Sequence, residues 1–310
     1  VVPSSGSQQV SIAHTLAWVI LTTDAERRVL LNPELALGEV YMVQGRLDDA
    51  IQQFQESLRV NPELDAAASE YGPSFRLAIC YFQKQEMLKA HSAVIRAVQA
   101  GSANPFVYNL LGLINLELQR FNDAVQSFRE AIRLTPAWTF HIPLPPPMPL
   151  EEWRQLTLSN FYCGLGMAYY RLEKIEAYRE ANQEAIDAYP ANPTPLINLA
   201  SLHKRLGNDA EAEQAFRDVV QRAQWQLDDD PRDNWTRCDL AQAYLVLGQP
   251  DAAFQHFARV LDQGAEPGML ETVRSGLAFL SESPTPIQRL DALIARIDEA
   301  LARPAQDAAL

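Results

Sequence analysis

Apolar and small residues recur along this chain at helical spacing, and one arrangement of them recurs as a block. In residues 35–62 the arrangement consists of Leu37, Gly38, Tyr41, Gly45, Ala50, Phe54 and Pro62. In residues 109–136 the same offsets carry Leu111, Gly112, Asn115, Ala124, Phe128, Ala131 and Pro136. Each block fits two helices joined by a short turn, with a proline that ends the second helix because it lacks the N–H donor.

Four further stretches repeat this arrangement, which gives blocks at 31–64, 71–104, 105–138, 159–192, 193–226 and 234–267. The pattern resembles the tetratricopeptide repeat, an antiparallel helix pair of about 34 residues. A lone helix pair cannot bury its apolar face, so its neighbours must stack on it. The resemblance therefore implies an all-α fold, a right-handed superhelical solenoid of antiparallel helix pairs.

The small residues of the pattern have specific roles. A glycine or alanine on the first helix allows the second helix to approach closely, and Gly45, Gly207 and Gly248 stand where the turn favours a left-handed residue. The fourth block departs from the pattern, because Tyr178 replaces the small residue of the second helix and the alanine falls one place earlier, at Ala177. We expect a turn that is one residue tighter, with Ala177 facing inward.

The segments outside the repeats are expected to cap or connect them. We assign residues 1–8 to a linker, 9–30 to N-terminal capping helices, 268–303 to C-terminal capping helices and 304–310 to a disordered tail. The last cap carries an amphipathic seam whose apolar residues are Ile287, Leu290, Ile294, Ile297 and Leu301. Packing on the last repeat is favoured for this seam, with a two-heptad coiled coil as the alternative.

A proline-rich insertion, residues 139–158, separates the repeats at 31–138 from those at 159–267. Its second part, "PLEEWRQLTLSN", is expected to extend the first helix of the fourth repeat backwards, with Pro149 near the start. Residues 139–148 are predicted to form an extended, polyproline-like strap. Apolar neighbours such as Phe140 and Ile142 favour docking on the chain's own solenoid, and the alternative is a ligand for an aromatic-lined domain.

Charge and composition exclude several classes of partner. The formal net charge of −13 argues against general attraction to nucleic acid or to an anionic membrane. The apolar run at 16–21 is far shorter than the roughly 20 residues that span a bilayer, so we expect no membrane insertion. The three cysteines are widely spaced, which favours a reducing, cytoplasmic compartment over a disulfide framework.

No motif in the sequence indicates catalysis, a metal site or a cofactor. The five histidines have no metal-ligand spacing, and "GLGMAY" at 164–169 lies inside a predicted helix with no strand before it. The acidic stretch 228–239 resembles a calcium loop, but Arg232 stands at a ligand position and Asp233 replaces the turn glycine. We expect this stretch to be a solvated connection, and the protein not to be an enzyme.

The candidate binding surface follows from helix geometry, since at about 100° per residue each first helix has a side opposite its packed face. The resemblance implies that this side lines a concave groove for partner segments. It carries Phe75, Arg76, Phe82, Phe106, Asn109, Leu116, Met167, Tyr170, Arg171, Asn198, Lys204 and Arg205. The alternative is packing between neighbouring first helices or under an insertion, which is equally favoured for Ile79, Leu110 and Leu113. The lysine–asparagine–arginine set with which co-chaperones of this family hold a terminal carboxylate is missing here.

These observations predict a non-catalytic protein–protein interaction scaffold or adaptor. Its partner would be a protein or peptide segment, apolar and with acidic residues that suit the arginines and lysine of the groove. The linker-like start "VVPSSGSQQ", which lacks an initiator Met, keeps open a regulatory or substrate-recruiting domain of a larger multidomain enzyme. A third hypothesis is a structural subunit of a stable assembly.

Overall fold

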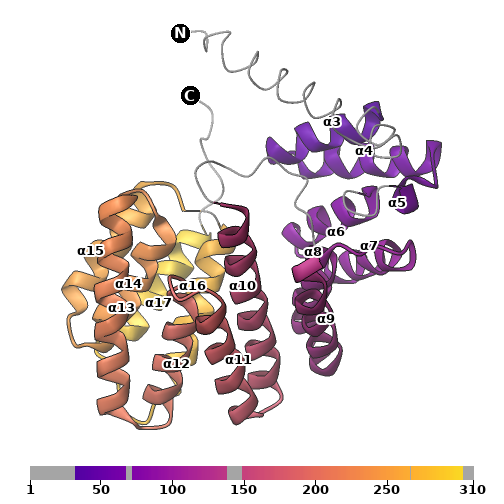
Figure 1. Ribbon diagram of the computed structural model, residues 1–310. Coiled ribbons are helices and arrows are strands. Elements are labelled where there is room, and N and C mark those ends of the chain that lie inside the picture. Colours follow the sequence, from indigo (N-terminus) through magenta and orange to yellow (C-terminus); the bar gives the residue numbers. More distant parts are fainter. Residues whose placement is uncertain (1–31, 68–71, 138–148, 266, 303–310) are drawn as a thin grey trace. The chain divides into compact units, whose positions relative to one another are not determined.

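The computed structural model describes residues 32–67, 72–137, 149–265 and 267–302, and this part is helical without any strand (Figure 1). The chain divides into two compact units, Val1–Pro143 and Leu144–Leu310. The expectations for the cap at 9–30, the strap at 139–148 and the tail at 304–310 fall outside the described residues.

Within the described residues, unit 1 contains three helix pairs, a short connecting helix and a final 3-10 turn. Its elements are α3 (Pro33–Val43), α4 (Leu47–Val60), α5 (Leu64–Ala67), α6 (Pro73–Gln83), α7 (Met87–Gln99), α8 (Pro105–Glu117), α9 (Phe121–Leu134) and η1 (Thr135–Ala137). The helices of a pair pack on each other, and the second helix of one pair packs on the first helix of the next.

In the part of unit 2 that the structure describes, there are three repeat pairs and one further pair. Its elements are α10 (Leu150–Arg171), α11 (Ile175–Ala188), α12 (Thr194–Arg205), α13 (Asp209–Asp229), α14 (Asn234–Val246), α15 (Pro250–Asp262), α16 (Pro267–Leu280) and α17 (Leu290–Ala302). The long helix α10 begins directly after Pro149, its N-cap residue. The predicted all-α fold of stacked antiparallel helix pairs is confirmed within each unit.

A close glycine–aromatic contact joins the two helices of a repeat. A Cβ placed on Gly112 would lie 2.8 Å from the ring of Phe128, and Phe128 itself is fully buried. The same contact joins Gly38 to Phe54, where a Cβ would lie 2.4 Å from the ring. In these two pairs, a residue larger than glycine would overlap the aromatic ring of the second helix unless the two helices moved apart.

The turns inside the six repeat pairs each contain one residue with positive φ at the same position. The left-handed conformation predicted for Gly45, Gly207 and Gly248 is confirmed, with φ of 72°, 77° and 72°. Residues without this freedom occupy the same turn position in the other pairs, for example Gln119 and Glu173, each at φ 58°. The turn geometry is thus set by the packing of the helices and does not depend on glycine.

The expectation of a tighter turn in the fourth repeat is wrong. Helix α10 ends at Arg171 and α11 begins at Ile175, the same interval that separates α3 from α4. Tyr178 faces inward with 1% of its side chain exposed, whereas Ala177 remains partly exposed. The tyrosine fits because its ring reaches past the helix crossing and its hydroxyl donates to the backbone oxygen of Asn198 at 3.0 Å.

The amide of Asn182 replaces the aromatic ring that other repeats place over the first-helix glycine. Its Nδ2 would lie 2.9 Å from a Cβ on Gly166 and donates to the Tyr178 backbone oxygen, while its Oδ1 accepts from Asn198 Nδ2 at 2.8 Å. The fourth repeat therefore exchanges apolar packing for a buried hydrogen-bonded cluster that also ties α11 to α12.

Removing the Tyr178 hydroxyl should have a modest cost. We expect Tyr178→Phe to lower the free energy of unfolding by about 0.5–1.5 kcal/mol, because the backbone oxygen of Asn198 loses a donor while the ring keeps its packing. Urea unfolding followed by circular dichroism measures the change. An unchanged stability would show that water replaces the hydroxyl at this site.

Candidate functional site

The groove face of unit 1 is the side of α6 and α8 that points away from their second helices. It carries the predicted site residues Arg76, Phe82, Phe106, Asn109 and Leu116. All five side chains are partly exposed, and Phe82 and Phe106 also pack at the edge of the core. The predicted site residue Phe75 lies in that core with 7% of its side chain exposed. The face thus presents aromatic and aliphatic groups, and two of them, Phe82 and Phe106, pack against the core on their inner side.

An ion pair crosses from the first repeat to the second on this side of unit 1. Arg76 on α6 pairs with Glu39 on α3, and its guanidinium lies 5.9 Å from the centre of the Phe75 ring. Burial raises the pKa of the Glu39 carboxyl, and the attraction of Arg76 opposes this shift. The Arg76–Glu39 ion pair thus places two charged groups beside the apolar side chains of the unit 1 groove face.

The predicted site residues of unit 2 lie on two first helices, with Met167, Tyr170 and Arg171 on α10 and Asn198, Lys204 and Arg205 on α12. We call the side of α10, α12 and α14 that bears such residues the groove face of unit 2. This face is not open, because α16 packs across it and contacts both α12 and α14. The aromatic ring of Phe279 on α16 also lies 4.7 Å from that of Tyr170 on α10, between ring centres.

Because α16 packs across the groove face of unit 2, the residues beneath this helix are buried. Ser201, Lys204 and Gln242 stand at positions that would face an empty groove, yet they are 4%, 8% and 8% exposed. Gln242 Nε2 donates to Ser201 Oγ at 3.1 Å, and its Oε1 would lie 3.3 Å from a Cβ on Gly276 of α16. The chain's own C-terminal region therefore fills the groove face that the sequence assigns to a partner.

The segment after α16, residues 281–285, is tied to α12 and α13 by three polar contacts, and we call it the latch. Glu282 forms an ion pair with Arg205, and the Ser283 hydroxyl donates to the Lys204 backbone oxygen at 3.0 Å. Thr285 Oγ1 donates to Asp209 Oδ2 at 2.8 Å. The hydrogen bond that Lys204 donates to Asp209, together with this bond from Thr285, lowers the pKa of the Asp209 carboxyl. These three polar contacts hold the segment that follows α16 against α12 and α13.

A cleft of about 540 Å³ remains open beside the latch. Its lining includes the predicted site residues Tyr170, Arg171 and Arg205, together with Leu206 and Glu282. The guanidinium of Arg205 lies 4.9 Å from the ring centres of both Tyr170 and Phe279. Three of the predicted residues are thus brought together here at the edge of α16.

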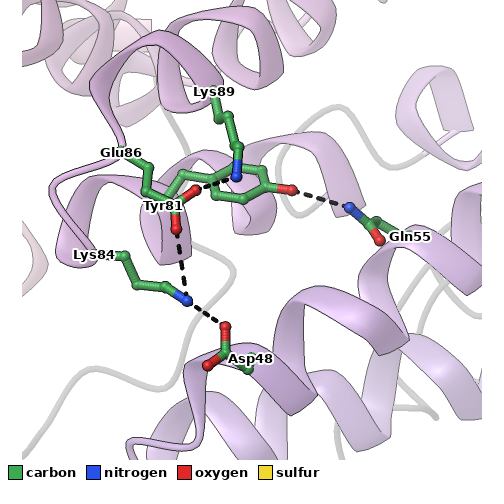
Figure 2. A network of polar contacts seen from close by, with 6 residues as sticks. All are labelled: Asp48, Gln55, Tyr81, Lys84, Glu86 and Lys89. Carbon is green, nitrogen blue, oxygen red and sulfur yellow. Dashed lines mark hydrogen bonds and ion pairs between the residues drawn. The ribbon is translucent and has the colours of Figure 1, made fainter.

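A second cleft in unit 1, of about 450 Å³, lies on the opposite side from its groove face, between α4 and α7. Figure 2 shows the polar contacts next to it, which join the first repeat to the second. Lys84 contacts both Asp48 and Glu86, and Gln55 Nε2 donates to the Tyr81 hydroxyl at 2.9 Å. Lys84 joins two carboxylates, and the network links the first repeat to the second.

Sequence reasoning missed both this cleft and the role of α16. The sequence did indicate a helix here, because residues 267–280 carry Leu270, Val273, Leu277 and Leu280 at helical spacing. A loop would lack this apolar periodicity. No comparable sequence signal marks the cleft, since it arises from the spacing between α4 and α7.

The three cysteine thiols are buried, and burial raises the pKa of each of them. Cys80, Cys163 and Cys238 are free thiols in buried positions, and burial raises the pKa of the Cys163 thiol to about 12. Within the ranges that the structure describes, no group of three or more His, Cys, Asp or Glu side chains could hold a metal ion. None of the helices in those ranges has the length and apolar character that crossing a membrane requires.

The half-buried carboxyl of Asp239 gives the folded protein a pH-dependent stability. Burial, and then the charge of Asp233, raises the pKa of Asp239 on α14 from 3.8 to about 8. The folded protein therefore holds this proton more tightly than the unfolded chain, and stability is lost as the pH rises from about 4 to about 8. We expect Asp239→Asn to reduce this loss by about 1 kcal/mol or more, measured as unfolding free energy at several pH values. Parallel profiles for both proteins would contradict the assignment.

Comparison with known proteins agrees with the helix pairs described above. Residues 35–64, 107–137 and 193–263 each match a model of the tetratricopeptide repeat. Among curated proteins, the chain is 23% identical over 197 residues to "BBSome complex member BBS4" of Mus musculus. The match covers 64% of this chain and 33% of that protein, so the chain spans about a third of the length of this relative.

Solved structures show the same architecture at low sequence identity. The chain is 17% identical to PilW, described as a widely conserved type IV pilus biogenesis factor, with a TM-score of 0.51 and coverage of 78% of this chain and 97% of that one. It is 16% identical to the MamA RS-1 ArsTM double mutant, with a TM-score of 0.50 and coverage of 63% and 97%. At these identities the likeness shows the fold alone.

Proposed function

Because this chain is a tetratricopeptide repeat protein, we propose that it is a non-catalytic interaction scaffold or adaptor that binds a partner segment on the groove face of unit 1. Proteins with this repeat are generally interaction modules without catalytic activity. The observation that carries the proposal is the set of partly exposed apolar side chains on that face, namely Phe82, Phe106, Leu113 and Leu116. Apolar groups gathered on one surface usually mark an interaction site.

The two units differ in what their groove faces offer. In unit 2 the face is covered by α16 and the latch, whereas the residues on the unit 1 face retain partial exposure. We therefore assign the primary partner contact to unit 1. The exposed cleft beside Tyr170, Arg171 and Arg205 is the part of unit 2 that a partner reaches without displacing α16.

The chemistry of both surfaces suits an apolar segment that carries acidic residues. Phe82, Phe106 and Leu116 favour aliphatic or aromatic side chains, and the amide of Asn109 can bond the backbone of an extended segment. Arg205, stacked on two aromatic rings at the unit 2 cleft, favours a carboxylate. The free, buried thiols Cys80, Cys163 and Cys238 support a reducing compartment such as the cytoplasm.

The direct experiment is an affinity pull-down with the full chain as bait. A variant that carries Phe82→Ala and Leu116→Ala serves as the matched bait, and a variant that carries Leu88→Ala, on the opposite side of unit 1 and 68% exposed, serves as the control. We expect one polypeptide to be recovered with the wild type and the control and to be lost with the groove variant. Equal recovery by all three baits would refute the assignment of the site.

A second candidate function is a permanent subunit of an assembly. The observation that favours it is the similarity to a protein described as a member of the BBSome complex. A subunit of this kind would be unstable or self-associating when purified alone. Light scattering that shows a monomer whose mass does not change with concentration would count against this candidate and leave the first one standing.

A further inference from the structure

We propose that unit 1 has a second binding surface, a furrow between α4 and α7 that takes an extended peptide segment with an acidic residue at its centre and apolar residues beside it. The cleft of about 450 Å³ described above adjoins a cleft of about 340 Å³, because Leu58 and Arg96 line both. We call the two clefts together the outer furrow. Its lining includes Gln55, Leu58, Tyr81, Ser92, Arg96 and Gln99. The inference goes beyond the proposed function, which uses the groove face, and does not depend on it.

The length of the outer furrow suits a peptide. Residues of α4 line one side and residues of α7 the other, and α6 packs on both helices and contributes Leu77 to the lining. The lining residues of α7 run from Lys89 to Gln99, which is about 15 Å along the helix axis. An extended chain covers this distance with about five residues.

The apolar part of the lining lies next to Arg96. Leu58 is partly exposed, and Leu77 and Ala93 beside it are 2% and 1% exposed. An aliphatic or aromatic side chain that covers these residues would remove further apolar surface from water, which favours binding. The occupant therefore carries apolar residues beside the position that meets Arg96.

Arg96 differs from the arginines at the ends of two other second helices in unit 1. Arg59 in the last turn of α4 and Arg133 in the last turn of α9 each pair with the glutamate three residues earlier, at 2.5 Å. Arg96 lies in the last turn of α7, where the residue three positions earlier is Ala93. It is exposed and forms no ion pair within the ranges that the structure describes. Its guanidinium is thus available for a carboxylate of the occupant, which it can bind through two nitrogens.

Two further groups that donate hydrogen bonds line the outer furrow. Gln55 Nε2 donates to the Tyr81 hydroxyl, so the hydroxyl hydrogen itself is not used in this bond (Figure 2). The Lys89 ammonium pairs with Glu86 and lies 5.6 Å from the centre of the Tyr81 ring. Both groups favour an occupant that carries acceptor oxygens.

The acid of the lining does not cancel this preference. Asp65 is 7% exposed, and its two carboxylate oxygens accept hydrogen bonds from the backbone N–H and the hydroxyl of Ser74. Its charge is therefore occupied within the fold and faces away from a ligand's reach. The accessible charges of the outer furrow are basic, in a chain whose formal net charge is −13.

The experiment uses the full chain and an array of pentapeptides. The central residue is Glu, Gln or Lys, and the four other positions carry Ala, Leu or Phe. We expect peptides with central Glu to retain the wild type about fivefold more strongly than those with central Gln, the upper range for an exposed ion pair. Arg96→Glu should reverse the preference in favour of central Lys, and Arg96→Gln should abolish it.

Two controls locate the binding. Arg133→Glu reverses a charge on α9, outside the outer furrow, and should keep the wild-type preference for central Glu. The groove variant with Phe82→Ala and Leu116→Ala should keep it as well, because the outer furrow lies on the opposite side of unit 1. Circular dichroism checks that each variant is folded, and Arg96→Gln alone decides the test if Arg96→Glu unfolds.

Four results would overturn the inference. The first is equal retention of the wild type by all three central residues, and the second is an unchanged preference for Glu in both Arg96 variants. The third is loss of the preference in the groove variant, which would place the peptides on the groove face. The fourth is a wild-type dimer in light scattering that Arg96→Gln abolishes, which would assign the outer furrow to a second copy of the chain.

Discussion

Replacing Phe128 with alanine is expected to lower the free energy of unfolding by about 3–5 kcal/mol. The ring is fully buried and fills the space over Gly112, whose backbone it approaches too closely for any Cβ to fit. Its removal opens a cavity between α8 and α9 that the rigid helix pair cannot close. Because stacked repeats support one another through their interfaces, the loss should extend beyond a single pair.

Urea unfolding followed by circular dichroism measures this change, with Leu88→Ala as the control. Leu88 is 68% exposed on α7, so its truncation should alter stability by less than about 0.5 kcal/mol. A loss below about 1 kcal/mol for Phe128→Ala would mean that the glycine–aromatic contact is not what holds the helices of a repeat together.

Truncating the groove face of unit 1 should weaken partner binding about thirtyfold without unfolding the protein. The anchors are Phe82 and Leu116, which are partly exposed, and we expect the two together to contribute about 2 kcal/mol to binding, the contribution typical of one central anchor. We expect Phe82→Ala with Leu116→Ala to show this loss in calorimetry with the recovered partner. Phe75→Ala is expected to differ, since this side chain is 7% exposed and its loss should lower stability as well.

The result that would contradict this prediction is a large fall in melting temperature with unchanged affinity. Phe82 and Leu116 would then be packing residues, as the sequence equally allowed for Ile79, Leu110 and Leu113. The control is again Leu88→Ala, which removes a comparable apolar group from the opposite side of the unit.

The repeat pattern predicted the helix pairs because each motif residue has a local physical role. Gly112 beside Phe128 is a contact between positions a fixed number of residues apart, and the left-handed turn at Gly45 is a property of the backbone itself. The proline that follows some of the second helices acts in the same local way: α9 ends at Leu134, two residues before Pro136.

The failures came from contacts between segments distant in sequence. The repeat pattern predicted that Tyr178 is too large for its position. The pattern could not show that its hydroxyl bonds the backbone of Asn198, because Asn198 belongs to the next repeat. The groove face of unit 2 appeared open because the position of α16 depends on packing, which the periodicity of its own sequence does not reveal. A periodic pattern identifies which side of a helix is apolar and leaves open which surface covers it.

The central claim is that a partner segment lies on the groove face of unit 1, and site-specific photo-crosslinking tests it most directly. The full chain is prepared with a benzophenone amino acid at the position of Asn109 on α8, and separately at the position of Leu88 on α7, and each is irradiated with the recovered partner. The account predicts a covalent adduct from position 109 and none from position 88. An adduct from position 88 alone would place the partner on the opposite side of the unit and contradict the account.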